Sequence, residues 1–440
     1  MKFFWGLLLG IHLAVGGYQL FHQRWMMVDS YEYVQAAENL RDHQTLYSAP
    51  WEDQSRMHHY SKRPPLYPAL LLINDWVLGS ELWILLWQIA LSMYAIWLTW
   101  RMWGMLQPKR TARWWMLPFL LFYPAQVMYS QLVMTELLLQ SLLLTSVWGW
   151  LMVEREGNGR WLWGSAGLLI LSMLTKPVMY LFGLPFLLMT VYWAWTHKRW
   201  TWILAGLIPL LFAFSYAKWN EARTGYFHYS SIQNLSLLQY TTHNLLTQVY
   251  GPDSALVLSD EIHYAAIGAP SYQEGQQTLT EACTQIVLDH LPQYAWMHTR
   301  GMINFFLDPG RFDLAHFWGW ESKEGAGFLR SFSENGYAGI WQFLQRQSIA
   351  QLLLLFCIAC FNGGKLLALV FLPWVKGLSW QEKGVVALLI LYVATLTGAS
   401  GASRFALPVS PLLLLCVGLV GHHWEKIRRK KHQPPVNNFQ

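Results

Sequence analysis

Charged side chains are scarce in this sequence. Only 13% of the 440 residues are Asp, Glu, Lys or Arg, and 54% are hydrophobic, whereas an ordinary soluble domain has about 25% charged residues. This composition excludes a protein whose main solvent is water. The formal net charge of +6 comes from short basic runs between apolar segments. Such runs are a signal of membrane topology, so we do not expect a nucleic-acid partner.

Cysteine is rare too, and metal-ligand motifs are lacking. Four cysteines are too few for a disulfide-rich scaffold. Cys357 and Cys360 form a C-x-x-C pair inside an apolar run without the strand and helix of a redox motif, so we expect small packing residues there. His58 and His59 are adjacent but belong to no HxxxH or HExxH pattern. The sequence therefore predicts no metal and no cofactor.

Long apolar runs are abundant by contrast. A membrane span needs about 20 apolar residues, and the first run is too long for a signal peptide and has no cleavage site after it. These runs predict an all-α polytopic membrane protein with about ten transmembrane helices and outer juxtamembrane helices. The ten predicted spans are 3–22, 81–103, 114–130, 134–153, 161–175, 177–196, 200–217, 349–374, 384–402 and 405–422.

The basic residues predict the orientation of these spans. Lysine and arginine gather in cytoplasmic connections of membrane proteins. If the N-terminus is inside, the inner connections contain Lys109, Arg110, Arg113, Arg155, Arg160, Lys198, Arg199, Lys376, Lys383 and the basic tail. The short outer connections contain little beyond Lys176 and Arg404. We therefore expect an inner or plasma membrane protein with both termini in the cytoplasm.

Two outer segments are too long to be simple connectors, and loops of such length usually carry function. The stretch from Tyr272 to Phe306, broken at Leu291-Pro292, predicts two amphipathic helices on or over the membrane. The predicted organisation is a first transmembrane helix (1–22), an outer loop with juxtamembrane helices (23–80), spans two to seven (81–217), a large outer helical loop (218–348), spans eight to ten (349–423) and a basic cytoplasmic tail (424–440).

Asp29 directly follows the first span, at the outer membrane surface. A carboxylate there can reach a lipid-linked headgroup, and in a partly apolar cleft its pKa would rise, which suits a general base. The alternative is that Asp29 caps a helix from about Ser30 to Arg41, with Glu32 completing a capping box.

The same outer loop ends in a basic and proline-rich motif, Lys62-Arg63-Pro64-Pro65-Leu66, before a short helix. Two cations at this place suit a clamp for a phosphate at the membrane surface. The alternative is that both side chains extend to the phosphates of bulk lipids.

These features together resemble the GT-C superfamily of glycosyltransferases, near the aminoarabinose transferases and protein O-mannosyltransferases. The resemblance is carried by the acid after the first span, the outer-loop helix, the basic residue before Pro-Pro-Leu and the late motif Ser403-Arg404-Phe405-Ala406-Leu407-Pro408. The segments 129–136, 174–177 and 286–306 are similar to the starts of the family's fourth and sixth spans and to its outer-loop helices. The resemblance covers residues 1 to about 421.

The resemblance implies a role for each matching residue. Asp29 would be the catalytic base, which deprotonates an acceptor that attacks the sugar with inversion. Lys62, Arg63 and Arg404 would hold the phosphate of a polyprenyl-phosphate-sugar donor, and the acceptor on the outer face would be a lipid, glycan or protein. Further candidates for the site lining are Tyr31, Glu32, His58, His59, Tyr67, Glu136 and Lys176. For Glu136 and Lys176 the alternative is anchoring at the membrane interface.

The sequence departs from the family pattern in two places. Ser403 stands where family members often have an acid or histidine before the late arginine, and the long outer loops contain no Asp-x-Asp. Two other functions stay open. A flippase for lipid-linked sugar would show paired repeats and broken spans, and an O-antigen type ligase or polymerase would use Arg300, Arg311 and His316. The sequence names neither the sugar nor the acceptor.

Overall fold

The protein is built from helices. The structure is a computed structural model that describes residues 2–52, 54, 56–107, 123–320 and 328–431, and within these ranges there is no strand. The predicted all-α class is thus confirmed. The long helices of the bundle are α1 (Lys2–His22), α4 (Ile84–Leu106), α7 (Glu136–Glu156), α8 (Arg160–Thr175), α9 (Gly183–His197), α10 (Trp202–Thr224), α18 (Ile349–Phe371), α19 (Trp380–Thr397) and α20 (Ser410–Lys431).

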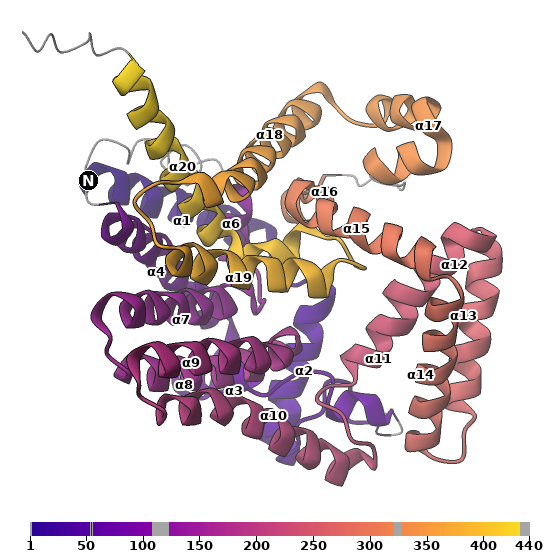
Figure 1. The fold of residues 1–440 in the computed structure, drawn as a ribbon. Coiled ribbons are helices and arrows are strands. Elements are labelled where there is room, and N and C mark those ends of the chain that lie inside the picture. Colours follow the sequence, from indigo (N-terminus) through magenta and orange to yellow (C-terminus); the bar gives the residue numbers. More distant parts are fainter. Residues whose placement is uncertain (1, 53, 55, 108–122, 321–327, 432–440) are drawn as a thin grey trace, which may run out of the picture.

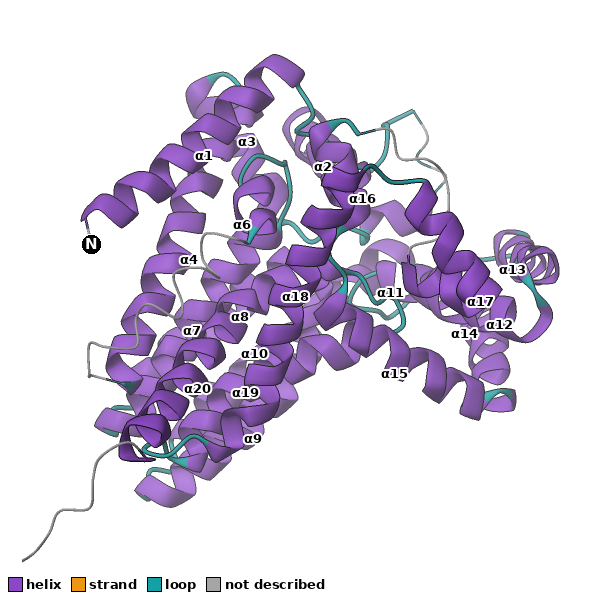
Figure 2. Cartoon of the chain, turned by 90° about the horizontal axis from the view of Figure 1, so that it is seen from above, coloured by secondary structure: helices purple, strands orange, loops and turns teal. Residues whose placement is uncertain are grey.

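The remaining helices are shorter or lie beside the bundle (Figures 1 and 2). Between α1 and α4 are α2 (Val28–His43), η1 (Met57–Tyr60), α3 (Leu66–Leu78) and η2 (Glu81–Trp83). The connections within the bundle contain α6 (Pro124–Tyr129), η4 (Pro177–Phe182), η6 (Leu372–Trp374) and η7 (Ser403–Val409). Between α10 and α18 are α11 (Ile232–Ser236), η5 (Leu237–Thr242), α12 (His243–Tyr250), α13 (Pro252–Ile267), α14 (Tyr272–Asp289), α15 (Leu291–Leu307), α16 (Arg311–Trp318) and α17 (Phe328–Gln345).

Several helices fit a multi-pass membrane protein. Six described segments have the length and composition to cross a membrane: Lys2–His22, Glu136–Glu156, Pro177–His197, Trp202–Thr224, Ile349–Trp374 and Ser403–Glu425. They correspond to six of the ten predicted spans. Among the others, α8 has only 16 residues, and most of the predicted span 114–130 lies outside the described residues. The full count of ten therefore stays a prediction.

The two ends of the bundle differ in their residues. Arg155, at the end of α7, forms an ion pair of 2.7 Å with Glu382 on α19, and Gly157 lies beside His197 at the end of α9. The predicted inner connections of α7, α9 and α19 thus meet at one end of the bundle, while Glu136 at the start of α7 marks the other end. Lys109, Arg110 and Arg113 lie outside the described residues.

Large aromatic side chains are buried inside the bundle. Trp103, Trp150 and Trp193 are fully buried, and the ring of Trp150 stacks on that of Phe182 at 5.7 Å. Helices also approach closely at small residues, as is usual where lipid cannot drive helix association. A side chain at Gly206 on α10, for example, would collide with α9 at Thr190.

The segment between α10 and α18 contains the two predicted amphipathic helices, α14 and α15, and α15 begins at the expected break, Leu291-Pro292. Ser271 directly precedes α14 and caps it, because its hydroxyl accepts a hydrogen bond of 3.2 Å from the Glu274 amide and so stabilises the first turn. α15 packs against α18, α19 and η7. Helices α11 to α15 lie at one end of the bundle in both views (Figures 1 and 2).

The prediction for the C-x-x-C pair is wrong. Cys357 and Cys360 are free and exposed, whereas Cys283 and Cys416 are buried. The two cysteines lie three residues apart on α18, and thus on one face of that helix, which the described residues leave uncovered.

Candidate functional site

The first turn of α2 presents three polar side chains on one face. The helix begins at Val28, and its first turn is closed by Ser30, whose hydroxyl accepts a hydrogen bond of 2.8 Å from the Met27 amide. Asp29 therefore does not cap the helix, and that alternative is wrong. Glu32 and Tyr33 follow Asp29 by three and four residues, the spacing that places side chains on one helical face.

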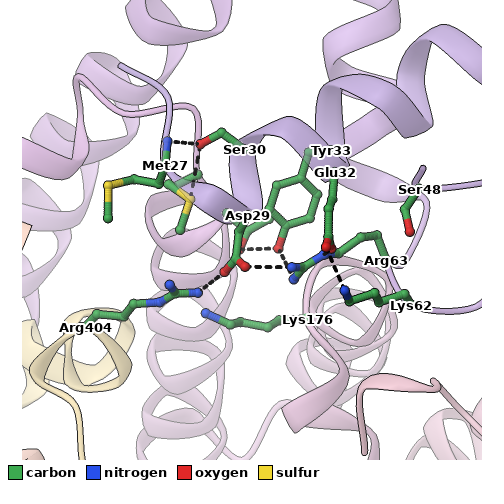
Figure 3. Close-up of polar contacts among 12 residues, drawn as sticks. Met27, Asp29, Ser30, Glu32, Tyr33, Ser48, Lys62, Arg63, Lys176 and Arg404 are labelled. Carbon is green, nitrogen blue, oxygen red and sulfur yellow. Dashed lines mark hydrogen bonds and ion pairs between the residues drawn. The ribbon is translucent and has the colours of Figure 1, made fainter. Parts of the chain in front are cut away.

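Asp29 lies between two arginines that come from distant parts of the chain (Figure 3). One carboxylate oxygen pairs with Nη2 of Arg63 at 2.7 Å. The other oxygen pairs with Nη2 of Arg404, the second residue of η7. The carboxylate is mostly buried, with 19% of its side chain exposed. The structure thus brings together the three residues for which the sequence analysis predicted the main roles.

Glu32 holds both cations of the basic loop motif. Its carboxylate pairs with Nζ of Lys62 at 2.6 Å and with Nε of Arg63 at 2.6 Å. The alternative that these two side chains extend to bulk lipid is therefore wrong. The guanidinium of Arg63 also lies over the ring of Tyr33, 4.9 Å from its centre, so its orientation is determined by three side chains of α2.

Glu136 and Lys176 are connected to the same group of charges through Arg404. Glu136, the first residue of α7, is fully buried and pairs with Nζ of Lys176 at 2.9 Å and with Nε of Arg404 at 3.3 Å. Lys176 lies where α8 ends and η4 begins. Anchoring at the membrane interface does not account for either residue, because a carboxylate this buried requires a cation as its partner.

These ion pairs join seven residues into one network, which we call the charge cluster: Asp29, Glu32, Lys62, Arg63, Glu136, Lys176 and Arg404. It contains four cations and three carboxylates, and therefore a surplus of one positive charge. Such a surplus in a largely buried place is unfavourable by itself and favours the binding of an anion.

The acid strength of Asp29 differs from the expectation. Burial acts to raise the pKa of Asp29, but the charges of Arg63 and Arg404 outweigh burial and hold the pKa well below its ordinary value. The expected rise of the pKa is therefore wrong. It assumed a partly apolar cleft, and the sequence did not show that two guanidinium groups would lie against this carboxylate.

Four of the predicted lining residues lie outside the charge cluster. Tyr31 points away, with 64% of the residue exposed. His59 binds the Ser48 hydroxyl through Nδ1 at 3.0 Å, and burial lowers the pKa of His58 to about 3, so His58 is neutral at neutral pH. Tyr67 lies behind Tyr33, with the two rings 5.2 Å apart.

Sequence reasoning missed the residue that positions Arg404. Both carboxylate oxygens of Asp308 accept backbone hydrogen bonds, one from Gly310 at 3.1 Å and one from Ser403 at 3.0 Å. Asn362 on α18 donates to the Asp308 carbonyl at 3.0 Å. Asp308 thereby connects the loop after α15 to Ser403, the residue just before Arg404. Ser403 itself has no acidic side chain. In the sequence, only the position of Asp308 directly after the apolar pair Phe306-Leu307 could have pointed to this role.

A second missed pair lies next to Arg404. The Tyr129 hydroxyl donates a hydrogen bond of 2.7 Å to Asp313 on α16. Burial raises the pKa of Asp313, so this carboxyl keeps its proton to higher pH than an exposed aspartate does. Asp313 is bonded to the Tyr129 hydroxyl and takes part in none of the ion pairs that define the charge cluster, so it is not a member of that cluster.

The residues that an O-antigen type mechanism would use have other surroundings. His316 lies 3.0 Å from the Met26 carbonyl, and the guanidinium of Arg311 lies over the ring of Phe312 at 4.6 Å. Arg300 is on α15. The ion pairs of the charge cluster include none of the three.

Comparisons with protein-family models, curated proteins and solved structures found no match for this chain. Within the described ranges there is also no group of three or more His, Cys, Asp and Glu side chains arranged to hold a metal ion. The charge cluster is the arrangement from which a function has to be inferred.

Proposed function

We propose that this protein is an integral membrane glycosyltransferase of the GT-C type. It transfers a sugar from a polyprenyl-phosphate carrier to an acceptor at the outer face of the plasma or inner membrane, with inversion at the sugar carbon. In this proposal ten helices span the membrane and both termini are cytoplasmic. The charge cluster then lies at the outer surface, at the end of the bundle opposite Arg155, Lys198 and Lys376.

The observation that carries the proposal is a carboxylate held between two arginines in a cluster with one surplus positive charge. A lipid-phosphate-sugar is a phosphodiester with one negative charge, which this surplus would neutralise. Fixed cations that face the leaving phosphate stabilise the charge that develops in the transition state, because they need no reorganisation during the reaction.

The reaction follows from the same charges. An acceptor hydroxyl attacks the anomeric carbon on the side opposite the phosphate, and the bond between that carbon and the phosphate oxygen breaks. The electron pair leaves with the phosphate, and Asp29 takes the acceptor proton. The product phosphate then carries up to two negative charges, and the cluster, with Asp29 neutral, carries two positive charges. The cluster therefore matches the charge of the donor before transfer and that of the lipid phosphate after it.

Donor binding would also activate the base. In the ligand-free site Arg63 and Arg404 lower the pKa of Asp29, which makes its carboxylate a weak base. A phosphate that takes over part of the interaction with Arg404 removes one of these stabilising charges, so the pKa of Asp29 rises. Arg404 suits this exchange because it contacts Asp29 and also lines an open cavity. Asp29 would thus become an effective base only when the donor is present.

The replacement Asp29→Asn tests the proposal. The variant keeps the shape of the side chain but cannot accept a proton, so we expect sugar transfer to fall about 10²-fold to 10⁴-fold, the usual contribution of a general base. The measurement uses the purified protein, a panel of radiolabelled polyprenyl-phosphate sugars and membrane extract as the source of acceptor.

A matched control is Asp42→Asn, at the other end of α2, where Asp42 forms an exposed ion pair with Arg41. This variant should transfer sugar at the normal rate. Full transfer by a folded Asp29→Asn protein would reject Asp29 as the base. Movement of labelled carrier lipid across liposomes, with no glycoside formed, would favour a flippase.

A further inference from the structure

A cavity adjoins the charge cluster on the side of α18. The cavity is partly open to solvent, and α6, α15, α16, α18 and η7 contribute to its walls. Most of the lining is apolar and includes Phe305, Phe306 and Ile358, while two acids, Asp308 and Asp313, also line the cavity. Asp308 is bonded to the backbone amides of Gly310 and Ser403, and Asp313 to the Tyr129 hydroxyl. Arg404 lines the cavity as well as contacting Asp29, so a ligand here would lie next to the proposed reaction centre.

Lys365 is the cation in this cavity that the proposed reaction does not use. It is on α18, one of the helices able to cross a membrane, and only 5% of the residue is exposed. Its ammonium lies over the ring of Tyr123, 4.1 Å from the ring centre. Among the residues that the structure describes it has no ion pair and no hydrogen bond, in contrast to Lys62 and Lys176, which each pair with a glutamate.

A buried ammonium without a carboxylate is costly, and an ionisable residue inside a spanning helix usually marks a functional site. The apolar packing of α18 does not require a lysine at this position. The amide of the cavity residue Asn362, one helical turn away, is already bonded to the Asp308 carbonyl. Lys365 is therefore the group in the cavity that a bound anion would stabilise most.

We propose that this cavity binds the phosphate end of the carrier lipid, with Lys365 and Arg404 as the phosphate-binding cations and the aromatic and aliphatic lining around the first isoprene units. The inference rests on the proposed function, because that function supplies the lipid phosphate. In this inference Lys365 takes over part of the phosphate-binding role that was predicted for Lys62 and Arg63, because those two cations are already paired with Glu32. A phosphate at Arg404 would also draw this arginine away from Asp29.

The test is a binding measurement with farnesyl phosphate, a short lipid phosphate, on the purified full-length protein. The variant Lys365→Met keeps the length of the side chain and removes the charge, so we expect its affinity for farnesyl phosphate to fall about tenfold to a hundredfold, the range for a charge-assisted hydrogen bond. Lys365→Arg should bind within about threefold of the wild type because the charge remains. Affinity for farnesol, which lacks the phosphate, should not change in either variant.

Two controls separate binding from folding. Lys218→Met replaces an exposed lysine that pairs with Glu221 on α10, and it should bind farnesyl phosphate normally. The ligand-free Lys365→Met protein should unfold at the same temperature as the wild type or higher, because an apolar side chain replaces a buried ammonium. A clear fall in that temperature would show that Lys365 has a structural role and would contradict the inference.

Further outcomes distinguish a lipid phosphate from a free phosphate as the ligand. They also distinguish failure of the cavity inference from failure of the proposed glycosyltransferase function. Equal binding of farnesyl phosphate to wild type and Lys365→Met would overturn the inference and leave the proposed function intact. Inorganic phosphate bound as tightly as farnesyl phosphate would show a site for free anions and overturn the lipid assignment. Loss of binding in Lys365→Met, with no sugar transfer by the wild type, would retain the cavity as a lipid-phosphate site and reject the glycosyltransferase.

Discussion

At the scale of the single residue, two effects act on the pKa of Asp29 in opposite directions. Burial disfavours its charged form, and the two arginines favour it more strongly. The pKa of Asp29 in the folded protein therefore lies below the value of about 3.9 for an unperturbed aspartate. A group of this kind contributes to stability when the pH is above the unfolded value, and the contribution is lost as the pH falls toward the folded value.

The pH dependence of stability follows from this sign. The difference in unfolding temperature between the wild type and Asp29→Asn should be constant from about pH 5 to pH 8 and should shrink below about pH 4, where the aspartate of the unfolded chain takes up a proton. Thermal unfolding of both proteins across this range measures the difference. A difference that changes steadily between pH 5 and pH 8 would show that Asp29 titrates there, contrary to the arrangement with two arginines.

Glu32 has a structural role distinct from that of Asp29. Its carboxylate fixes Lys62 and Arg63 together. We expect Glu32→Gln to lower the free energy of unfolding by about 2 kcal/mol, since breaking a buried ion pair costs about 3–5 kcal/mol and this pair is partly exposed. Arg63 would also lose its orientation, and sugar transfer should fall.

Chemical denaturation and the transfer assay measure both effects of Glu32→Gln. The control is again Asp42→Asn, whose exposed pair should leave stability and transfer unchanged. Wild-type stability in Glu32→Gln would mean that the two cations find other partners in solution.

At the scale of the elements, the placement of Arg404 depends on how α15 meets the loop after α19. Gly301 on α15 packs directly against Gly398, so that a Cβ atom at residue 301 would lie 1.7 Å from the Gly398 carbonyl oxygen. Asp308, at the end of α15, then accepts the hydrogen bond from Ser403. α15 thus positions Arg404 through one close helix contact and one carboxylate.

Gly301→Ala should therefore disturb the site from a distance. The methyl group must push α15 away from Gly398, at a cost of about 1–3 kcal/mol typical of overpacking, and Arg404 should move with the loop. We expect lower stability and weaker sugar transfer. The control Gly164→Ala adds a methyl group on α8 where nothing lies within 4 Å. It should leave sugar transfer unchanged and should not lower stability, because alanine favours a helix more than glycine does. Normal activity in Gly301→Ala would show that the loop is positioned without α15.

At the scale of the whole molecule, apolar runs predicted the long helices well because burial in lipid demands them. The predicted span 3–22 corresponds to Lys2–His22, and 349–374 corresponds to Ile349–Trp374. The break at Leu291-Pro292 separated α14 from α15, since proline begins a helix more readily than it continues one. Of the remaining four predicted spans, 161–175 corresponds to the short helix α8, and most of 114–130 lies outside the described residues.

The contacts of the site were harder to predict than its members. Position after a span pointed to Asp29, and charge beside proline pointed to Arg63. The role of Glu32 as partner of both loop cations depends on how α2 packs against the loop, which single-sequence patterns do not specify. Tyr33 was detectable by its spacing from Asp29 on one helical face. Lys365 was detectable as a lone lysine inside a predicted span.

In the proposed function, Asp29 acts as the base for sugar transfer at the outer face of the membrane. The most direct measurement adds a water-soluble acceptor fraction to sealed vesicles that contain the protein and a radiolabelled polyprenyl-phosphate sugar. We expect labelled product when the vesicles have the outer face exposed and none when the inner face is exposed. With Asp29→Asn, product from the outer face should form at least about 10²-fold more slowly. Product formed only from the inner face, or by the Asp29→Asn protein at the wild-type rate, would contradict the account.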